Sequence, residues 1–420
     1  MKRQIGFKYR LDPTPEQAAR LRVLAGHSRF VWNKALAECQ ATRERGESVP
    51  RYNTMAGWLT AWKRQPDLAF LTEAYTDNLQ QKLRDLDTAW QRYFAPELDA
   101  EPPSFKKKGK SRDSIRFVNF PKYCALGHRE VKLPAGLGWV GFRQSRQSRK
   151  RRPFLPTAER GQVEFALNRE MPPTVGKIKN CTVGLDGGDW SISFLIEYEV
   201  KVPTHPAVTA IGLDMGVAHF VTDSDGKHYA GRNSFRHIER RLAKAQRRLK
   251  HKAKFSQNWK TQKARIARLH HRAACARCDT LHQLSTRLSK SHAMIAIEDL
   301  KVANMTASAK GTQEVPGKRV KQKAGLNKAI LDQGWFEFRR QLAYKQAWRG
   351  GLLEVVPPRH TSQTCPECQH VDAGNRVTQA RFHCQSCGYS TNADVVGARN
   401  VLARAHAHLS GRDAPVAPVK

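Results

Sequence analysis

The sequence predicts a multidomain α+β protein, in which a β-rich N-terminal body with a helical insertion precedes an α/β block that carries a four-cysteine zinc ribbon. Length supports several domains, because 420 residues suggest about two to four. Strand and helix patterns change character near residue 205, where a short linker pattern occurs. Two C-x2-C motifs near the C-terminus then predict a metal-binding module.

Charge is the strongest compositional signal in the chain. Lys and Arg number 73 against 37 Asp and Glu, which gives a formal net charge of +36. Self-repulsion of this size destabilises a compact chain unless an anionic partner neutralises it. The expected partner is nucleic acid and not a membrane surface, because the basic residues are spread along the chain and do not gather on one amphipathic helix. Charge alone does not separate DNA from RNA.

The chain has the sequence features of a soluble intracellular protein. Residues 1–8 contain no apolar h-region, and no stretch of 18 uncharged apolar residues occurs. The nine cysteines are an odd number, which suits a reducing compartment better than a disulfide framework. We therefore expect no membrane association.

The N-terminal block begins with a strand and a long helix. Residues 5–11 alternate polar and apolar side chains, as a half-buried strand does. Thr14 can cap the following helix, Pro15 suits its first turn, and Gln17 completes a capping box. This helix is predicted to extend to about Cys39.

A second helix is predicted from about Thr76 to Phe94, since leucine and aromatic residues recur there at helical spacing. Its other face carries Gln80, Gln81 and Arg84. Gln and Arg have the donor geometry to read base edges, so these three residues are candidate nucleic-acid contacts. A merely solvated face is the alternative.

Two basic loops accompany the predicted strands of this block. The first, residues 105–112, contains the candidate phosphate contacts Lys106, Lys107 and Lys108 and leads into a strand at about 114–120. The second covers residues 143–152. A strand over 190–200 and a linker at 202–206 complete a block that ends near residue 205.

A buried strand opens the second block and ends in a carboxylate. Residues 208–213 lead to Asp214, and Gly216 lets the backbone turn closely. A carboxylate at a strand end is a common way to present a metal ligand at the rim of a sheet. The pattern predicts a ribonuclease-H-like sheet. Actin-like and sugar-kinase ATPases share it, so it does not by itself specify a reaction.

Residues 232–277 form a strongly basic, largely helical stretch with sixteen Lys or Arg residues and a single acid. Such an imbalance requires phosphate nearby, and Arg247 and Arg248 are candidate contacts. Cys275 and Cys278 form a lone C-x2-C within a helix. We interpret them as part of an ordinary buried face, with metal binding as the weaker alternative.

Two further carboxylates stand at element boundaries. Glu298 closes the apolar run 293–297, which is typical of a buried strand. Burial of a carboxylate is costly without a partner, and a metal ion would supply one. A helix from about 328 to 348 and a strand over 354–356 follow. Asp394 lies in the first turn of the last predicted helix.

The C-terminal cysteines predict a structural zinc ribbon. Cys365 and Cys368 are separated by fifteen residues from Cys384 and Cys387, so two knuckles can each offer two thiolates to one tetrahedral ion. The alternative, a pair of disulfides, needs an oxidising compartment that nothing upstream supports. Four thiolates leave no open position for water, so the Zn²⁺ is expected to be structural.

Several motifs in order make the chain resemble TnpB, a family of transposon-encoded RNA-guided endonucleases related to type V CRISPR effectors. The resemblance covers nearly the whole chain and rests on residues 9–17, 29–33, 103–107, 211–216, 297–300, 326–338, and the ribbon with 392–394. It implies five parts: a wedge-like β-barrel at 1–205 with a helical recognition insertion at about 14–100; a RuvC-like nuclease domain at 206–357 with a basic helical insertion at about 232–290; the zinc ribbon at 358–391; a final RuvC segment at 392–410; and a disordered tail at 411–420.

The resemblance also implies an activity. Asp214, Glu298 and Asp394 fall on the three RuvC acidic positions, and such a set can hold two Mg²⁺ ions about 3.5 to 4 Å apart for phosphodiester hydrolysis. The implied partners are a guide RNA, with one chain per guide, and a double-stranded DNA target cut next to a short flanking motif. The implied location is the prokaryotic cytoplasm, at the nucleoid. Gln369 and Val396 depart from the family pattern, which often has Gly and Asn there.

Other functions stay open at this point. An RNA-guided protein that represses without cutting would lose acidic positions, whereas all three acids are present. An accessory transposase protein would act in strand transfer, which joined DNA products would reveal. An ATPase would need a Gly-rich phosphate-binding loop beside Asp214, and it would leave the ribbon and the charge unexplained.

Overall fold

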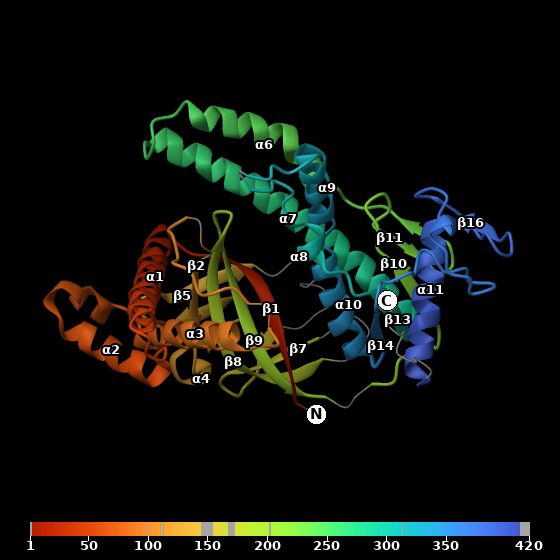
Figure 1. The fold of residues 1–420 in the computed structure, drawn as a ribbon. Helices are drawn as coiled ribbons and strands as arrows, with labels where there is room; N and C mark the ends of the chain where they lie inside the picture. The colour runs from red at the N-terminus through yellow and green to blue at the C-terminus, as the bar shows by residue number, and fades with distance from the viewer. Residues whose placement is uncertain are drawn as a thin grey trace. The chain divides into compact units, whose positions relative to one another are not determined.

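The computed structural model describes residues 2–98, 100–109, 111, 113–143, 154–166, 173–200, 203–312 and 314–411. The chain divides into two compact units, Met1–Lys201 and Val202–Lys420, and the mixed α+β composition is confirmed (Figure 1). Most of the predicted basic loop at 143–152 and nearly all of the tail at 411–420 lie outside the described residues. Among the described helices, none is long and apolar enough to cross a membrane.

The first unit is built on an antiparallel nine-stranded sheet with the order β3-β4-β5-β1-β9-β8-β7-β6, in which β2 pairs with β8. Its strands are β1 Lys2–Asp12, β2 Asp113–Phe117, β3 Ala125–Leu126, β4 Glu130–Leu133, β5 Gly138–Arg143, β6 Phe154–Pro156, β7 Gln162–Phe165, β8 Thr174–Asp186 and β9 Asp189–Glu199. Alternate side chains of β9 are buried, as its sequence pattern predicts. Among the described strands, β3 and β6 end the hydrogen-bonded order without pairing to each other. The sheet is therefore not closed into the expected barrel.

The helices of the first unit lie beside this sheet (Figure 1). They are α1 Pro15–Glu44, α2 Tyr52–Arg64, the 3-10 helix η1 Pro66–Glu73, α3 Thr76–Phe94 and the short α4 Phe120–Tyr123. The predicted capping box is present, because the backbone N–H of Gln17 donates to Thr14 Oγ1 and the N–H of Thr14 donates to Gln17 Oε1. Helix α1 runs past the predicted end at Cys39, since the first residue with a helix-terminating left-handed backbone is Gly46 (φ 79°).

The second unit contains a five-stranded sheet with the order β12-β11-β10-β13-β14. Its strands are β10 Ala210–Asp214, β11 Val221–Asp223, β12 His228–Tyr229, β13 Met294–Glu298 and β14 Leu352–Val356. Strands β10, β13 and β14 are parallel, whereas β11 is antiparallel to β10. In chain order the sheet reads 3-2-1-4-5, which is the ribonuclease-H-like arrangement that the sequence predicts.

Helices cover both faces of this sheet. The helices of this unit are α6 Ser234–Lys250, α7 Gln257–Ser291, α8 Val302–Met305, α9 Val320–Gln333, α10 Trp335–Arg349 and α11 Ala393–Leu409, of which α6 packs against α7. Leu284 of α7 and Phe338 of α10 pack with Leu213 and Ile297 on one face. On the other face, Val401 of α11 packs with Ala296. The sheet thus lies between two helical layers.

One predicted helix is two helices in the structure. The sequence pattern predicts a single helix over about 328–348, but α9 ends at Gln333 and α10 begins at Trp335. Gly334 between them has a φ of 77°, a left-handed conformation that only glycine adopts without strain and that interrupts the helix. The prediction was wrong because apolar spacing continues across the break.

The cysteine-rich segment forms a small two-stranded module. It contains the 3-10 helix η2 Ala373–Asn375 and the antiparallel strands β15 Arg381–His383 and β16 Ser390–Asn392. Phe382 is fully buried and packs with Cys365, Cys384 and Val396. Since β16 runs directly into α11, the module is continuous with the helix that carries Asp394.

Candidate active site

Two of the predicted acids end neighbouring parallel strands. Leu213 of β10 pairs with Ile297 of β13, so Asp214 and Glu298 both follow at the carboxyl edge of the sheet. In open α/β sheets this edge is where ligands bind. The strand register therefore brings together two carboxylates that are 84 positions apart in the sequence.

Helix α11 brings the third acid to the same edge. The helix approaches β10 so closely that a Cβ atom on Gly212 would overlap the carbonyl oxygen of Ala398. A Cβ atom on Gly397 would stand 3.1 Å from Oδ2 of Asp214. Asp394 lies three residues before Gly397 and so on the same side of the helix. Two glycines thus allow the contact that places Asp394 near Asp214.

The charges of the three acids act on one another. The pKa of Asp214 is raised to about 7, first by burial and then by the negative charges of Glu298 and Asp394. Burial also raises the pKa of Glu298. Arg376 lies 3.9 Å from Asp394 and opposes both shifts. Arg404 also lowers the pKa of Glu298. The two arginines do not fully offset burial and mutual repulsion, because the pKa values of Asp214 and Glu298 stay raised, so this edge of the sheet is a locally acidic site in a basic protein.

A hydrogen-bond network orients Glu298. The Thr361 hydroxyl donates to Oε1 of Glu298 at 2.6 Å, and this bond lowers the pKa of Glu298 against the effect of burial. Asn400 of α11 donates through its amide to the carbonyl oxygens of Thr361 and Thr364, each at 2.7 Å. The loop before the cysteine module is therefore tied to α11 and to the second acid at once.

These supporting residues were not predicted from the sequence. Thr361 is an ordinary loop threonine until the fold brings it to Glu298. Gly397 does carry a signal, because an isolated glycine inside a helical pattern often marks a close packing contact. Gly212 carries the corresponding signal in a strand.

The arrangement of the acids suits hard divalent cations. Their ligand oxygens do not all lie within 4.8 Å of one another, as a set of three ligands to a single ion would in the described part of the chain. The three acids therefore do not form a ready-made site for a single ion in the described residues. Oxygen donors are nevertheless the ligands that Mg²⁺ prefers, and a cation would compensate the charges of Asp214 and Glu298, whose pKa values are raised first by burial.

Asp299, the residue after Glu298, does not belong to this set. Its carboxylate accepts from Arg339 at 2.6 Å and from Lys301 at 2.7 Å. These hydrogen bonds lower its pKa, in contrast to the raised value of Glu298. The last residue of β13 and the residue that follows it thus have opposite electrostatic environments.

The four C-terminal cysteines converge as predicted. All their sulfur atoms lie within 4.8 Å of one another, with 3.6 Å between Cys365 and Cys387 and 3.6 Å between Cys368 and Cys384. Four sulfurs at this spacing are compatible with one tetrahedral ion. Gln369, the first departure from the family pattern, has a φ of 61°, which explains why glycine suits that position.

The predicted nucleic-acid contacts on the first unit differ in exposure. Gln80 and Gln81 of α3 are half-buried, whereas Arg84 is exposed, with its guanidinium 3.9 Å from the centre of the Tyr52 ring. Lys106 is half-buried, 3.4 Å from the centre of the Trp32 ring.

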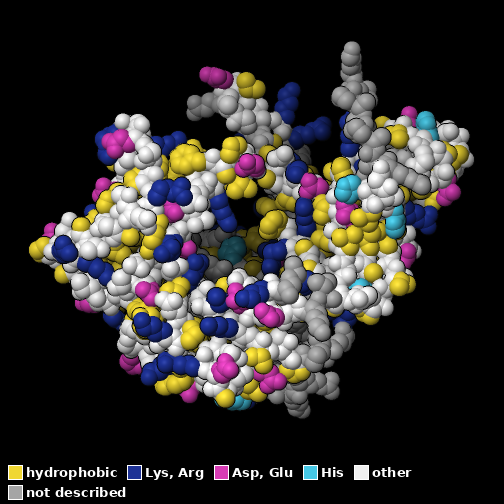
Figure 2. All heavy atoms as spheres, turned by 90° about the horizontal axis from the view of Figure 1, so that it is seen from below, with side chains coloured by type: hydrophobic (Ala, Val, Ile, Leu, Met, Phe, Trp, Pro, Cys, Tyr) yellow, Lys and Arg dark blue, Asp and Glu magenta, His cyan; other side chains and the backbone are white. Residues whose placement is uncertain are grey.

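Burial lowers the pKa of Lys106 to about 8, which weakens its case as a phosphate contact. Lys107 and Lys108 are exposed. On the second unit, Arg247 and Arg248 are exposed on α6. Figure 2 shows Lys and Arg side chains distributed across the visible face.

The lone cysteine pair lies in α7, as predicted, but Cys275 is exposed and Cys278 is half-buried, so the expected buried face is wrong for Cys275. Cys278 is within 4.8 Å of ligand atoms of His282 and Glu337. The Glu337 carboxylate, however, already accepts from Arg340 at 2.7 and 2.8 Å and from Gln341 at 2.9 Å. This ion pair favours the interpretation of Cys278 as part of a packed helix face.

Comparison with known proteins identifies the family. A family model described as "Probable transposase" matches residues 193–309, one described as "Cas12f1-like, TNB domain" matches 335–401, and a "Helix-turn-helix domain" model matches 1–48. A protein of Escherichia coli strain K12, named "Putative RNA-guided DNA endonuclease InsQ", is 44% identical over 98% of this chain and 94% of its own length. The chain belongs to the TnpB family.

Other relatives agree with membership of the TnpB family. A protein of Streptomyces pristinaespiralis, named "Putative RNA-guided DNA endonuclease", is 34% identical over 94% of this chain and 88% of its own length. A "CRISPR-associated endodeoxyribonuclease Cas12f1" of Sulfoacidibacillus thermotolerans is 41% identical over 71 residues, 16% of this TnpB chain and 17% of that protein. The model matching 335–401 covers all four ribbon cysteines and Asp394.

Proposed function

We propose that this TnpB-family protein is an RNA-guided DNA endonuclease. The observation that carries the proposal is the meeting of Asp214, Glu298 and Asp394 at one sheet edge, where burial and then the charges of the other two acids raise the pKa of Asp214. The two relatives that match over most of their length, from Escherichia coli and Streptomyces pristinaespiralis, are both named as RNA-guided DNA endonucleases, which gives independent support. A non-cutting repressor has no need of three coupled carboxylates, so cleavage is the favoured activity.

In this proposal the carboxylates hold Mg²⁺ at the sheet edge. Two bound ions would activate a water molecule and stabilise the leaving oxygen of an in-line phosphodiester hydrolysis. The protein keeps Glu298 oriented through the Thr361 hydroxyl. It keeps Asp394 in place through the close contact of α11 with β10. Because the pKa of Asp214 is raised to about 7, this carboxyl is only partly charged near neutral pH, and a bound cation would favour its charged form.

A guide RNA supplies sequence recognition, and double-stranded DNA is the target. Base pairing reads the target, while the protein binds backbones and a short flanking motif. The net charge of +36 supports extensive phosphate contact, with one chain per guide. In this scheme residues 1–205 hold the wedge and recognition functions, and residues 206–357 with 392–410 form the RuvC-type nuclease.

The ribbon at 358–391 has a structural part in the proposal. Its four thiolates would bind one Zn²⁺ with no open coordination position. Because the ribbon lies between Glu298 and Asp394 in the chain and ends where α11 begins, its folding holds the third acid in register.

Two linked measurements test the proposed function. RNA that copurifies with the protein is sequenced, and the complex is then offered a matched and an unmatched plasmid with Mg²⁺. We expect cutting of the matched plasmid alone, and we expect Asp214→Ala to bind it without cutting. Binding without cutting by the unaltered protein would favour a repressor, and joined products would favour a transposase role.

A further inference from the structure

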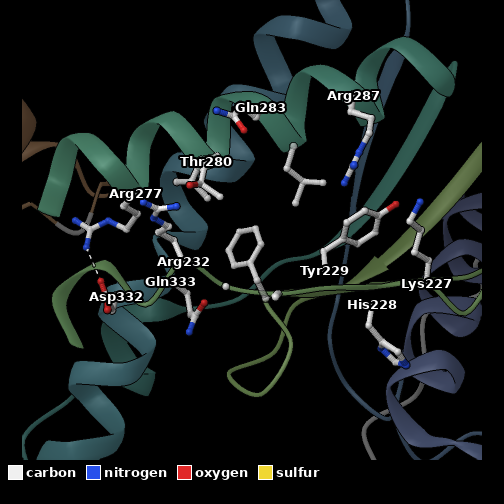
Figure 3. Close-up of a pocket in the computed structure, with 15 residues that line it drawn as sticks. Lys227, His228, Tyr229, Arg232, Arg277, Thr280, Gln283, Arg287, Asp332 and Gln333 are labelled. Atoms are coloured by element: carbon white, nitrogen blue, oxygen red, sulfur yellow. Dashed lines mark hydrogen bonds and ion pairs between the residues drawn. The ribbon is translucent and has the colours of Figure 1, made fainter. Parts of the chain in front are cut away.

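A cavity of about 430 Å³ lies in the second unit beside the β11–β12 hairpin (Figure 3). Its walls come from this hairpin, from one face of α7 and from the end of α9. Cavities of this size are typical of sites that enclose a small organic ligand, and a lone inorganic ion needs far less space. The proposed cleavage chemistry makes no use of this cavity.

Four cationic side chains line the cavity: Lys227, Arg232, Arg277 and Arg287. The single acid among the lining residues, Asp332, is already engaged. It pairs with Arg277 at 3.2 Å and accepts from the backbone N–H of Phe235 at 2.9 Å, at the start of α6. The remaining cations therefore leave the cavity positively charged.

Gln333 provides a second and independent indication of a ligand. The residue is only 4% exposed, yet its side-chain amide makes no hydrogen bond to the residues that the structure describes. Figure 3 shows this amide at the cavity, below Arg232. A Cβ atom on Gly231 would stand 2.7 Å from Oε1 of Gln333, so glycine keeps the space beside the amide open. The amide atoms are not among the fully buried unsatisfied atoms of the described residues, so they stay accessible from the cavity and can hydrogen-bond to a ligand there.

Aromatic side chains complete the lining. The guanidinium of Arg287 lies 5.0 Å from the centre of the Tyr229 ring, and Phe220 is a buried apolar wall. In Figure 3, Arg287, Tyr229 and Lys227 lie toward one end, whereas Arg232, Arg277 and Gln333 lie toward the other. Cations with aromatic and apolar surface are the lining that single-stranded nucleic acid requires, since they meet phosphate and base respectively.

The β11–β12 hairpin that lines the cavity also lies beside the acidic edge, the edge of the sheet that carries Asp214, Glu298 and Asp394. Strand β11 pairs with β10 so that Thr222 lies opposite Asp214, and the lining residue Phe220 precedes β11 directly. A nucleic-acid strand bound in this cavity would therefore contact the β11–β12 hairpin, which lies next to the strand that ends in Asp214.

We propose that this cavity binds one unstacked nucleotide of a nucleic-acid strand, with its phosphate near the cations, its base on the apolar wall and a polar edge within reach of the Gln333 amide. The choice of a nucleic acid as partner rests on the proposed function. Guide RNA and target DNA share this chemistry and are the two sources to be distinguished.

The test measures binding without cleavage. Affinities for a single-stranded RNA oligonucleotide with the sequence of the copurified RNA, and for DNA of the same sequence, are measured in EDTA at several salt concentrations. The variants are Arg287→Ala, which removes an exposed lining cation, and Gln333→Leu, which removes the amide at similar size. Arg272→Ala, exposed on the same helix and outside the cavity, is the matched charge control.

Gln333→Leu should weaken binding on the order of tenfold without changing the salt dependence, because it removes a base or sugar contact. Its thermal stability should not fall. Arg287→Ala should weaken binding more than Arg272→Ala and lower the salt slope by about one. If the two variants lose affinity for the RNA alone, the bound nucleotide belongs to the guide. If they lose affinity for the DNA alone, it belongs to the target.

Wild-type affinity of Gln333→Leu and Arg287→Ala for both oligonucleotides would overturn the proposal. This result is distinguishable from failure of the endonuclease proposal, because binding in EDTA requires no cutting. Conversely, weakened binding by both variants would support the cavity even if the protein cut no plasmid.

Discussion

A Cβ atom on Gly212 would overlap the carbonyl oxygen of Ala398, so strand β10 and helix α11 touch backbone to backbone. This contact lies two residues before Asp214 and four residues after Asp394. The geometry of the acidic edge therefore depends on a position that has no side chain. We therefore expect packing at this point to affect the proposed cleavage activity.

Replacement of Gly212 tests that coupling. Gly212→Ala should destabilise the protein by about 1 to 3 kcal/mol through overpacking, and it should strongly reduce cleavage because α11 must shift away with Asp394. Gly325→Ala is the matched control, since a Cβ there meets nothing within 4 Å on an exposed helix. It should stabilise by about 0.5 to 1 kcal/mol. Denaturant unfolding and plasmid cleavage check both, and full activity of Gly212→Ala would contradict the account.

The Thr361 hydroxyl should matter for chemistry more than for folding. Thr361→Val removes the 2.6 Å hydrogen bond to Glu298 and so raises the pKa of that carboxyl further. A hydrogen bond to a charged group contributes about 1.5 to 3 kcal/mol, which corresponds to a rate loss of roughly ten- to a hundredfold. The acid limb of the rate profile should move to higher pH, and Thr361→Ser should restore it. An unchanged profile in Thr361→Val would remove the proposed role.

Stability without divalent cations should fall as pH rises toward neutrality. The pKa of Asp214 in the folded state, about 7, lies above the ordinary value of 3.8 for an aspartate, so the folded state retains a proton that the unfolded state releases between these values. The free energy of unfolding therefore decreases with rising pH across this window. Relative to Asp214→Asn, the unaltered protein in EDTA should lose thermal stability from about pH 5 to about pH 7.5, and Mg²⁺ should reverse the loss. Parallel curves for the two proteins would contradict the shift.

Loss of the cysteine cluster should act through the third acid. Cys384→Ser should remove the bound metal and reduce cleavage, because the ribbon leads directly into α11. Cys275→Ser, which alters an exposed cysteine of α7 outside the cluster, should retain one Zn²⁺ per chain and normal cleavage. Metal content by mass spectrometry and plasmid cleavage check the pair. Intact cleavage by a zinc-free Cys384→Ser variant would separate the ribbon from the active site.

The sequence predicted the strands that carry the acids, because buried apolar runs ending in Asp214 and Glu298 have a local signature. It also predicted the cysteine module, since ligand spacing is encoded within a short segment. The break at Gly334 was missed because apolar periodicity continues through it, and only the backbone shows the left-handed turn. Thr361 could not be found, as its role depends on a contact across 63 positions. The closed barrel came from the family resemblance alone, and the described strands do not pair around it.

The most direct test of the central claim compares two adjacent acids on strand β13 and the loop that follows it. The single-turnover rate of cutting a guide-matched DNA in Mg²⁺ is measured for Glu298→Gln and for Asp299→Asn. Glu298 faces the acidic edge, whereas Asp299 is paired with Arg339 and Lys301. We predict that Glu298→Gln binds the target but cuts at least about a thousandfold more slowly, while Asp299→Asn stays within about tenfold of the unaltered protein. Equal rates for Glu298→Gln and the unaltered protein would contradict the assignment of the nuclease centre.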